Sequence, residues 1–187
     1  LSARRGDRLE ALAVEIAKEC AVATRVVAVD LASPEGATQL VAAVEDLEIA
    51  VLVNNAGFGY AGRFERRDEQ RLVEMIQVHC TAPLVLTHRL LPKMRSRGRG
   101  AVVFTGSLAA KQPMPLHATY AATKAFVELL GEGLWAELRG SGVDVLVVEP
   151  GTTATEFQEV AGEVPHEGET PEHVVEGNGW IVSSWPS

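Results

Sequence analysis

Cysteines are few in this sequence, and long apolar runs are lacking. The two cysteines, Cys20 and Cys80, form no CxxC or Cys/His grouping, so neither a disulfide framework nor a zinc site is predicted. Buried thiols in a reducing compartment are expected instead. No apolar run approaches the roughly 20 residues that cross a bilayer, and the first residues lack the apolar stretch of a secretory signal. We therefore expect a cytoplasmic protein with no membrane partner and no bound metal.

Basic charge is also in short supply. Seventeen Lys and Arg residues face twenty-five Asp and Glu residues, which gives a formal net charge of −8. This balance argues against a nucleic acid or an anionic membrane as the main partner. A small-molecule ligand fits better. With 187 residues, of which 47% are hydrophobic, the chain suits one ordinary globular domain.

Strand-like and helical patterns alternate along most of the chain. Strands are predicted at 25–31, 49–53, 101–105 and 143–149. Helices are predicted at 7–19, from the Ser33–Glu35 cap onward, at 68–97 and at 117–139. The strands are apolar on both faces, which predicts an α/β domain with a doubly wound, mostly parallel, Rossmann-like sheet.

The end of the chain does not follow this alternation. Residues 161–187 lose periodicity and are predicted to form a loop and a short helix. We place the domain at 1–175, followed by a poorly determined tail at 176–187.

Three polar or glycine-containing segments directly follow predicted strands: Asn54–Gly57, Gly106–Ser107 and Pro150–Thr155. Ligands bind beyond the carboxyl ends of the strands in such sheets, so these segments are expected to converge on one rim. The next helix carries Tyr120 and Lys124 on one face, one turn apart. A phenol has a reference pKa of about 10, and a nearby cation favours its ionised form. With Ser107 beside them, these groups could transfer a proton to or from an alcohol or carbonyl oxygen without a metal.

These motifs resemble the short-chain dehydrogenase/reductase family. The family's Tyr-x-x-x-Lys signature is similar to Tyr120-Ala-Ala-Thr-Lys124, and Ser107 precedes it at the family's interval. Asn54–Gly57 and Pro150–Gly151 match further family motifs, in family order. The resemblance implies hydride transfer between NAD(P)H and a carbonyl or alcohol, and a homo-dimer or homo-tetramer.

The resemblance also implies a role for each matching residue. Tyr120 would be the acid/base, Lys124 would lower its pKa and hold the nicotinamide ribose, and Ser107 would position the substrate oxygen. The remaining cofactor contacts would come from strand ends: Asp30 and Leu31 beside the adenine, Asn54, Ala56 and Gly57 behind the adenosine, and Pro150, Gly151, Thr153 and Thr155 around the nicotinamide.

The first residues bear on the choice between NADP and NAD. NAD-specific members carry an acid at the end of the second strand, whereas Leu1–Arg5 has no acid there and contains Arg4 and Arg5. A guanidinium suits a 2′-phosphate, so NADP is favoured over NAD. The two arginines could instead be a solvated surface pair.

Two features depart from the family pattern. His79 replaces the family's catalytic Asn, whose backbone carbonyl helps to hold a water in a proton relay. Pro83, four residues later, has no N–H to donate to the His79 carbonyl and favours a kink. We therefore take His79 as a modified relay position, with a packing role as the alternative. The family's first strand and glycine-rich TGxxxGxG turn are not found, so the chain is expected to be a fragment with an incomplete sheet.

Other functions stay open at this point. The chain could be a non-catalytic remnant or oligomerisation partner that keeps the later units of the fold. It could also be a nucleotide-sugar or redox-sensing binder, because a fold does not fix a function. Ser107 could serve only as a cap, and Asn54 and Asn55 could serve only turn geometry. Met114, Leu116 and Phe157 suggest an apolar component in the substrate pocket.

Overall fold

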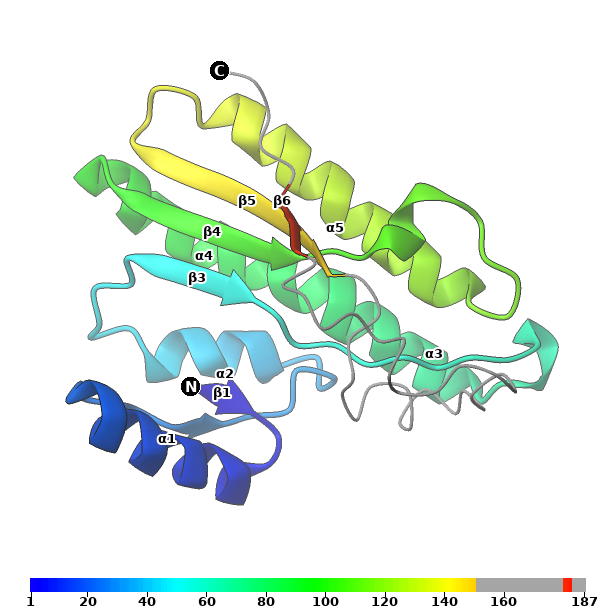
Figure 1. Cartoon of the computed structure of the whole chain (residues 1–187), viewed down its shortest axis with the longest axis horizontal. Coiled ribbons are helices and arrows are strands. Elements are labelled where there is room, and N and C mark those ends of the chain that lie inside the picture. The colour runs from blue at the N-terminus through cyan, green and yellow to red at the C-terminus, as the bar shows by residue number, and fades with distance from the viewer. Residues whose placement is uncertain (151–179, 183–187) are drawn as a thin grey trace.

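A computed structural model describes residues 1–150 and 180–182 and places their strands in two sheets (Figure 1). The smaller sheet pairs β1 (Ser2–Ala3) and β2 (Val27–Ala28) in parallel. The larger sheet has the order β3-β4-β5-β6. Its members are β3 (Val51–Asn54), β4 (Gly100–Thr105), β5 (Val143–Pro150) and β6 (Trp180–Val182). The first three run parallel and β6 is antiparallel, so the predicted mostly parallel α/β arrangement is confirmed.

Helices connect the strands and cover the larger sheet. The α-helices are α1 (Gly6–Cys20), α2 (Gly36–Ala43), α3 (Glu69–Ile76), α4 (Ala82–Arg97) and α5 (Ala118–Glu137). Shorter helical turns are η1 (Phe64–Arg66), η2 (Gln77–Thr81) and η3 (Leu108–Lys111). Figure 1 shows α4 and α5 running alongside the β3–β5 strands.

The main core lies between β4, β5 and the two long helices. Met94 of α4, Phe104 of β4, and Val127 of α5 are at most 3% exposed and pack in one cluster with Val147 of β5. Phe104 and Val147 are register partners, so the alternation of the two strands presents both side chains to the same face. This packing fixes α5, and hence the residues on its first turns, against the sheet.

The predicted helix at 68–97 is interrupted. Between α3 and α4 the chain makes a π-helical turn, η2, in which the Ala82 N–H donates to the Gln77 carbonyl oxygen. Pro83 supplies the physical reason, because it has no N–H to continue the ordinary ladder, and a wider turn accommodates the mismatch. The irregularity expected near His79 is therefore present as a π turn.

Three further expectations need correction. The second helix begins at Gly36 because Ser33 and Pro34 form a turn, in which the Gly36 N–H donates to the Ser33 carbonyl at 3.0 Å. Part of the predicted tail is the strand β6, which pairs with the edge of β5 and so satisfies its backbone groups. Cys20 is an exposed free thiol at the end of α1, and Cys80 is half-buried.

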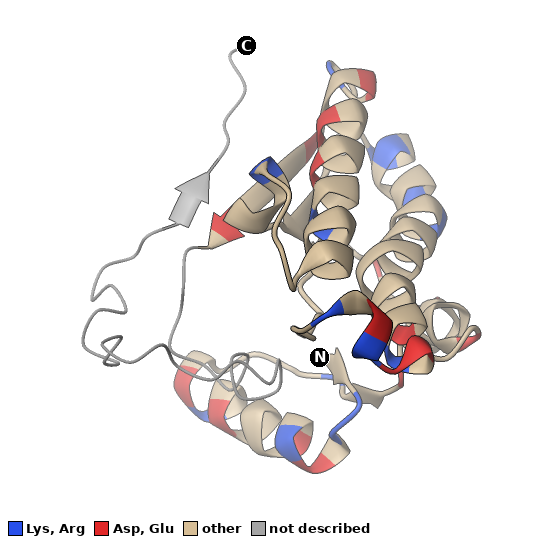
Figure 2. Cartoon of the chain, turned by 90° about the vertical axis from the view of Figure 1, so that its right-hand side faces the viewer, with Lys and Arg blue, Asp and Glu red and all other residues tan. Residues whose placement is uncertain are grey.

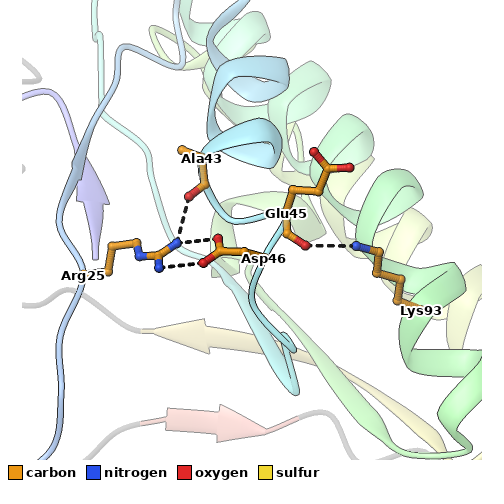
Figure 3. Close-up of polar contacts among 5 residues, drawn as sticks. All are labelled: Arg25, Ala43, Glu45, Asp46 and Lys93. Carbon is orange, nitrogen blue, oxygen red and sulfur yellow. Dashed lines mark hydrogen bonds and ion pairs between the residues drawn. The ribbon is translucent and has the colours of Figure 1, made fainter.

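The two sheets are joined through α2 rather than by a strand. Among the described residues no strand pairs with both the β1–β2 sheet and β3, and Val51 and Val53 on β3 are 55% and 58% exposed. Figure 3 shows Arg25, which precedes β2, paired with Asp46 beyond α2 and bonded to the Ala43 carbonyl. The distance from Arg25 Nη1 to Asp46 Oδ1 is 2.6 Å. The split matches the expectation that 25–31 has no bridge to 49–53.

A glycine contact at the far end of the larger sheet tests this packing. Gly142 has φ +76°, and a Cβ there would lie 1.9 Å from the Gly98 carbonyl oxygen. Gly140 has φ +74° but open space around it. Gly142→Ala is expected to lower the free energy of unfolding by roughly 2 kcal/mol more than Gly140→Ala, because only the former adds a backbone clash to the strain of positive φ. Urea unfolding measures both, and equal losses would contradict the contact.

Candidate active site

The segments that follow β3, β4 and β5 meet at one rim of the larger sheet. The Thr105 hydroxyl donates to the Asn55 side-chain oxygen at 2.9 Å, which joins the ends of β3 and β4. The Gly106 N–H donates to the Val148 carbonyl at 2.8 Å, which joins the ends of β4 and β5. The predicted convergence is thus confirmed for the described residues. Pro150 ends β5; the predicted contacts Gly151, Thr153 and Thr155 lie outside the described residues.

Tyr120 and Lys124 lie on the first turns of α5 and face the same rim. The Lys124 ammonium is buried and donates to the Thr105 carbonyl at 2.7 Å, at the end of β4. It also lies 5.8 Å from the centroid of the Tyr120 ring. Because Thr105 is two residues before Ser107, the ammonium connects the tyrosine with the strand end that carries the serine.

Burial tunes this ammonium. Burial lowers the pKa of Lys124 to about 8, and the nearby Cys80 thiol partly opposes this effect. Lys124 is therefore still mostly protonated at neutral pH, and its charge is available to stabilise an ionised phenol. Burial also raises the pKa of Cys80 to about 11, so this thiol stays protonated and is a poor nucleophile.

Ser107 has two hydrogen-bonding capacities. Its Oγ accepts the Ala109 N–H at 3.2 Å and thereby caps η3, as the alternative interpretation of this residue predicted. A hydroxyl that accepts one bond can still donate its own hydrogen. Capping fixes the position of Oγ and leaves the O–H for another oxygen, so the two interpretations are compatible.

An ion-pair cluster anchors the turn that carries Ser107. Lys111, at the end of η3, contacts Glu128 of α5 and Glu149 of β5, the latter at 2.7 Å. The Glu149 side chain is 3% exposed. Two hydrogen bonds raise the pKa of Lys111: the bond to Glu128 has the larger effect, and the bond to Glu149 has the smaller. Residues 111, 128 and 149 share no local spacing, so no sequence pattern predicted this cluster.

The residues predicted to hold the adenosine half follow strands of both sheets: Asp30 and Leu31 come after β2, and Asn54, Ala56 and Gly57 stand at the end of β3. Ala56 and Gly57 are exposed, Leu31 is half-buried, and the exposed Asp30 accepts the Ala32 N–H at 3.0 Å. The Asn54 amide donates to the Thr87 hydroxyl at 3.3 Å. The buried Asn54 Oδ1 has no hydrogen-bond partner, so an acceptor is left over at the end of β3. Exposed backbone beside this acceptor fits a nucleoside.

Arg4 and Arg5 are exposed residues between β1 and α1. Arg5 is the N-cap residue of α1, so both arginines stand at the start of that helix, directly after the strand end. This placement suits a phosphate, because backbone N–H groups point outward at a helix start.

His79 is buried at 2% exposure in the π turn and contacts both sides of the site. Its Nε2 accepts the Phe58 N–H at 2.9 Å, and its Nδ1 lies 2.9 Å from the Thr123 hydroxyl oxygen. Burial and then the Lys124 charge lower the pKa of His79 to about 3. Neither Phe58 nor Thr123 was predicted as a site residue. The position of Thr123, three residues after Tyr120 on the same helix, is the one sequence signal that could have indicated it.

A small pocket opens beside the first turn of α5. Its volume is about 40 Å³, and its lining includes Tyr60, Phe64, Leu116 and Thr119. Of the apolar residues predicted for a substrate pocket, Leu116 lines this cavity. Phe157 lies outside the described residues. Figure 2 shows acidic and basic residues interspersed along the helices of this side. In the described part of the chain, no helix is both long and apolar enough to span a bilayer.

Comparisons with known proteins agree with this geometry. The sequence model of the short chain dehydrogenase family matches residues 1–164. The very-long-chain 3-oxoacyl-CoA reductase of Anas platyrhynchos is 32% identical over 166 residues, which cover 86% of this chain and 53% of that protein. The 7beta-hydroxysteroid dehydrogenase of Clostridium sardiniense is 32% identical over 155 residues, covering 83% and 59%.

A solved structure is similar over a comparable span. The short-chain dehydrogenase from Sphingobium yanoikuyae in complex with NADPH superposes with a TM-score of 0.83 at 35% identity, covering 88% of this chain and 64% of that one. The chain thus spans little more than half of the length of the curated relatives named above. With its motifs, its strand order and a family match over most of its residues, the chain belongs to the short-chain dehydrogenase family.

Proposed function

We propose that this chain carries the catalytic residues of an NADP(H)-dependent oxidoreductase that interconverts a carbonyl compound and a secondary alcohol. One observation carries the proposal: the buried Lys124 ammonium, 5.8 Å from the Tyr120 ring centroid, is bonded to the strand end that precedes Ser107. A phenol, a cation and a hydroxyl at one rim form a proton-transfer group for an oxygen atom.

The residues divide the chemistry as follows. When bound, the nicotinamide supplies or accepts the hydride. In the reducing direction, the Tyr120 hydroxyl gives its proton to the carbonyl oxygen as the carbon takes up the hydride. Lys124 stabilises the phenolate that remains, and the Ser107 O–H donates to the same substrate oxygen. In the oxidising direction, the Tyr120 phenolate takes the alcohol proton.

The names of the relatives support this class of substrate. One is a 3-oxoacyl-CoA reductase and another is a hydroxysteroid dehydrogenase, and both names imply an exchange between a carbonyl and an alcohol. The pocket beside α5 has apolar lining from Phe64, Leu72 and Leu116, which favours a substrate with an apolar part.

An activity assay needs backbone N–H groups that bind the cofactor pyrophosphate, and the printed sequence contains no TGxxxGxG turn to supply them. We suggest a chimera in which this chain follows the first strand, glycine-rich turn and helix of a relative. NADPH oxidation by the chimera with a panel of ketones tests the proposal. Turnover above the level of the same chimera without ketone supports it, and absence of turnover in a folded chimera that binds NADPH overturns it.

Cofactor choice is expected to depend on the two arginines. Each charge-assisted hydrogen bond to a phosphate is worth about 1.5–3 kcal/mol, so Arg4→Ala with Arg5→Ala should weaken NADPH binding by at least about tenfold. NADH binding should change little. Fluorescence titration of the chimera with NADPH and NADH gives the ratio of the two dissociation constants. Arg66→Ala, which removes an exposed arginine of η1, is the control. An unchanged ratio would assign the pair to the solvated surface.

A non-catalytic remnant of the fold is the second candidate. The separation of the β1–β2 and β3–β6 sheets favours it, because the surface between these sheets has no strand among the described residues. Titration of the 187-residue chain alone with NADPH separates the candidates. Micromolar binding by this chain would count against the remnant.

We also propose a homo-dimer or homo-tetramer in the cytoplasm. Support for self-association comes from exposed apolar side chains on α4 and α5, where Leu84, Phe126 and Leu129 are 43%, 38% and 68% exposed. Light scattering coupled to gel filtration that finds only monomers would contradict the oligomer.

A further inference from the structure

We propose that His79 is a positioning residue: its neutral imidazole, with the proton on Nδ1, ties the loop after β3 to α5 and so fixes Tyr120. This inference rests on the proposed role of Tyr120 as acid/base. It concerns the His79 side chain and leaves open the use of the backbone carbonyl, through which the family resemblance implies a proton relay at position 79.

The direction of the hydrogen bonds fixes the tautomer. A backbone N–H can only donate, so the Phe58 N–H at 2.9 Å requires an unprotonated Nε2 on His79. A neutral imidazole then carries its proton on Nδ1, which donates to the Thr123 hydroxyl oxygen at 2.9 Å. Thr123 in turn donates to the Tyr120 carbonyl at 2.8 Å. The result is one continuous chain of bonds from Phe58 to Tyr120.

The surroundings of His79 disfavour a second proton on the ring. The side chain is 2% exposed, and the charged group that α5 places nearby is the Lys124 ammonium. Tyr120 of α5 faces the ring edge to face, and the Arg71 guanidinium of α3 lies over the Phe58 ring at 4.0 Å. Protonation of Nε2 would therefore break the Phe58 bond and add a cation where cations already lie.

The loop after β3 is shaped to receive this imidazole. A Cβ on Gly57 would lie 3.0 Å from His79 Nε2, so the glycine permits the close approach of the loop to the ring. The Phe58 and His79 rings pack edge to face, with their centroids 5.7 Å apart. The same loop contains Ala56 and Gly57, which are exposed on the predicted cofactor side.

Tyr120 is held in two ways by this arrangement. Its backbone carbonyl accepts the Thr123 hydroxyl, and its ring packs on the His79 ring at a centroid distance of 5.7 Å and an interplanar angle of 77°. The hydrogen bonds of both His79 ring nitrogens lead to backbone groups, the Phe58 N–H and, through Thr123, the Tyr120 carbonyl, and neither of these groups exchanges a proton with a substrate. Its contribution to the reaction is the placement of the phenol relative to the loop.

The tautomer can be read directly by nuclear magnetic resonance on the 187-residue chain with ¹⁵N-labelled histidine. The signal is assigned by its loss in His79→Asn. We expect an Nδ1–H pattern that persists from about pH 7.5 to about pH 5, the range in which an ordinary histidine titrates. An Nε2–H pattern, or protonation of His79 within that range, overturns the proposal. Neither result depends on turnover, so failure here is distinct from failure of the proposed oxidoreductase function.

Two threonine variants test the coupling. Thr123→Val removes the hydroxyl with little change of volume, and Thr123→Ser keeps it. We expect amide exchange at Phe58, on the far side of the ring, to become about tenfold faster in Thr123→Val and to stay at the original rate in Thr123→Ser. Equal Phe58 rates in the folded Thr123→Val variant and the original chain would show that the two bonds are independent and would overturn the positioning role.

Discussion

Tyr120→Phe is expected to lower NADPH-dependent ketone reduction by the chimera about a thousandfold, within the range of general acid–base catalysis. This loss equals about 4 kcal/mol of transition-state stabilisation. Phenylalanine retains the ring that packs on His79 and lies near Lys124, so the site should keep its shape. The lost atom is the hydroxyl that exchanges a proton with the substrate oxygen. NADPH affinity should therefore be nearly unchanged.

The sequence offers a matched control for this variant. The other tyrosine, Tyr60, uses its hydroxyl oxygen to accept the Asp68 N–H at 3.2 Å, and its ring lines the pocket beside α5. Tyr60→Phe should change the KM for the ketone more than kcat. If Tyr120→Phe keeps the original kcat while the protein stays folded, another group supplies the proton and the proposed mechanism is wrong.

Lys124→Met is expected to reduce the reaction rate about a hundredfold, because a neighbouring charge of opposite sign moves a pKa by about 1 to 3. Methionine fills the space of the buried stem without the charge. The bond to the Thr105 carbonyl is lost as well, so the end of β4 loses a direct connection to α5. Stopped-flow measurement of NADPH oxidation gives the rate, and Lys18→Met on the exposed end of α1 controls for loss of a lysine.

Lys124 also predicts how the rate depends on pH. Its pKa is lowered to about 8, so the ammonium loses its proton as the pH rises through this value and ketone reduction should fall there. Lys124→Met should lack this decrease. A variant that retains the same alkaline decrease would place the ionising group elsewhere.

The stability of the folded chain should show the opposite trend. Burial disfavours the charged form of Lys124, so the unfolded state binds more protons between about pH 8 and the ordinary value of 10.5. The free energy of unfolding attributable to this group therefore rises across that window. Urea unfolding of Lys124→Met should show a smaller rise than the original chain.

Local patterns were sufficient to locate most of the candidate site. The spacing of Tyr120 and Lys124 follows from one helical turn, and the residues after the strands follow from the rule that parallel strands end at a common rim. Interruption of the predicted 68–97 helix was only partly foreseeable: Pro83 predicted an irregularity, but the π turn that buries His79 depends on how α3 and α4 pack.

Contacts between distant segments could not be read in this way. Lys111 of η3 meets Glu128 of α5 and Glu149 of β5. His79 of η2 meets Phe58 in the loop after β3 and Thr123 of α5. The sequence separations of these pairs are set by the lengths of the intervening helices and strands. Their geometry therefore emerges only when those elements pack.

The amino-acid order alone determined the α/β class and the placement of Tyr120 and Lys124 one turn apart, because periodicity and helical spacing are local properties of the chain. Only the tertiary structure decided what surrounds those groups. Burial of Lys124 sets its ionisation, and an N–H from a distant loop sets which nitrogen of His79 carries the proton. Solvent exclusion and the direction of a hydrogen bond depend on neighbours in space, and the folded chain supplies those neighbours.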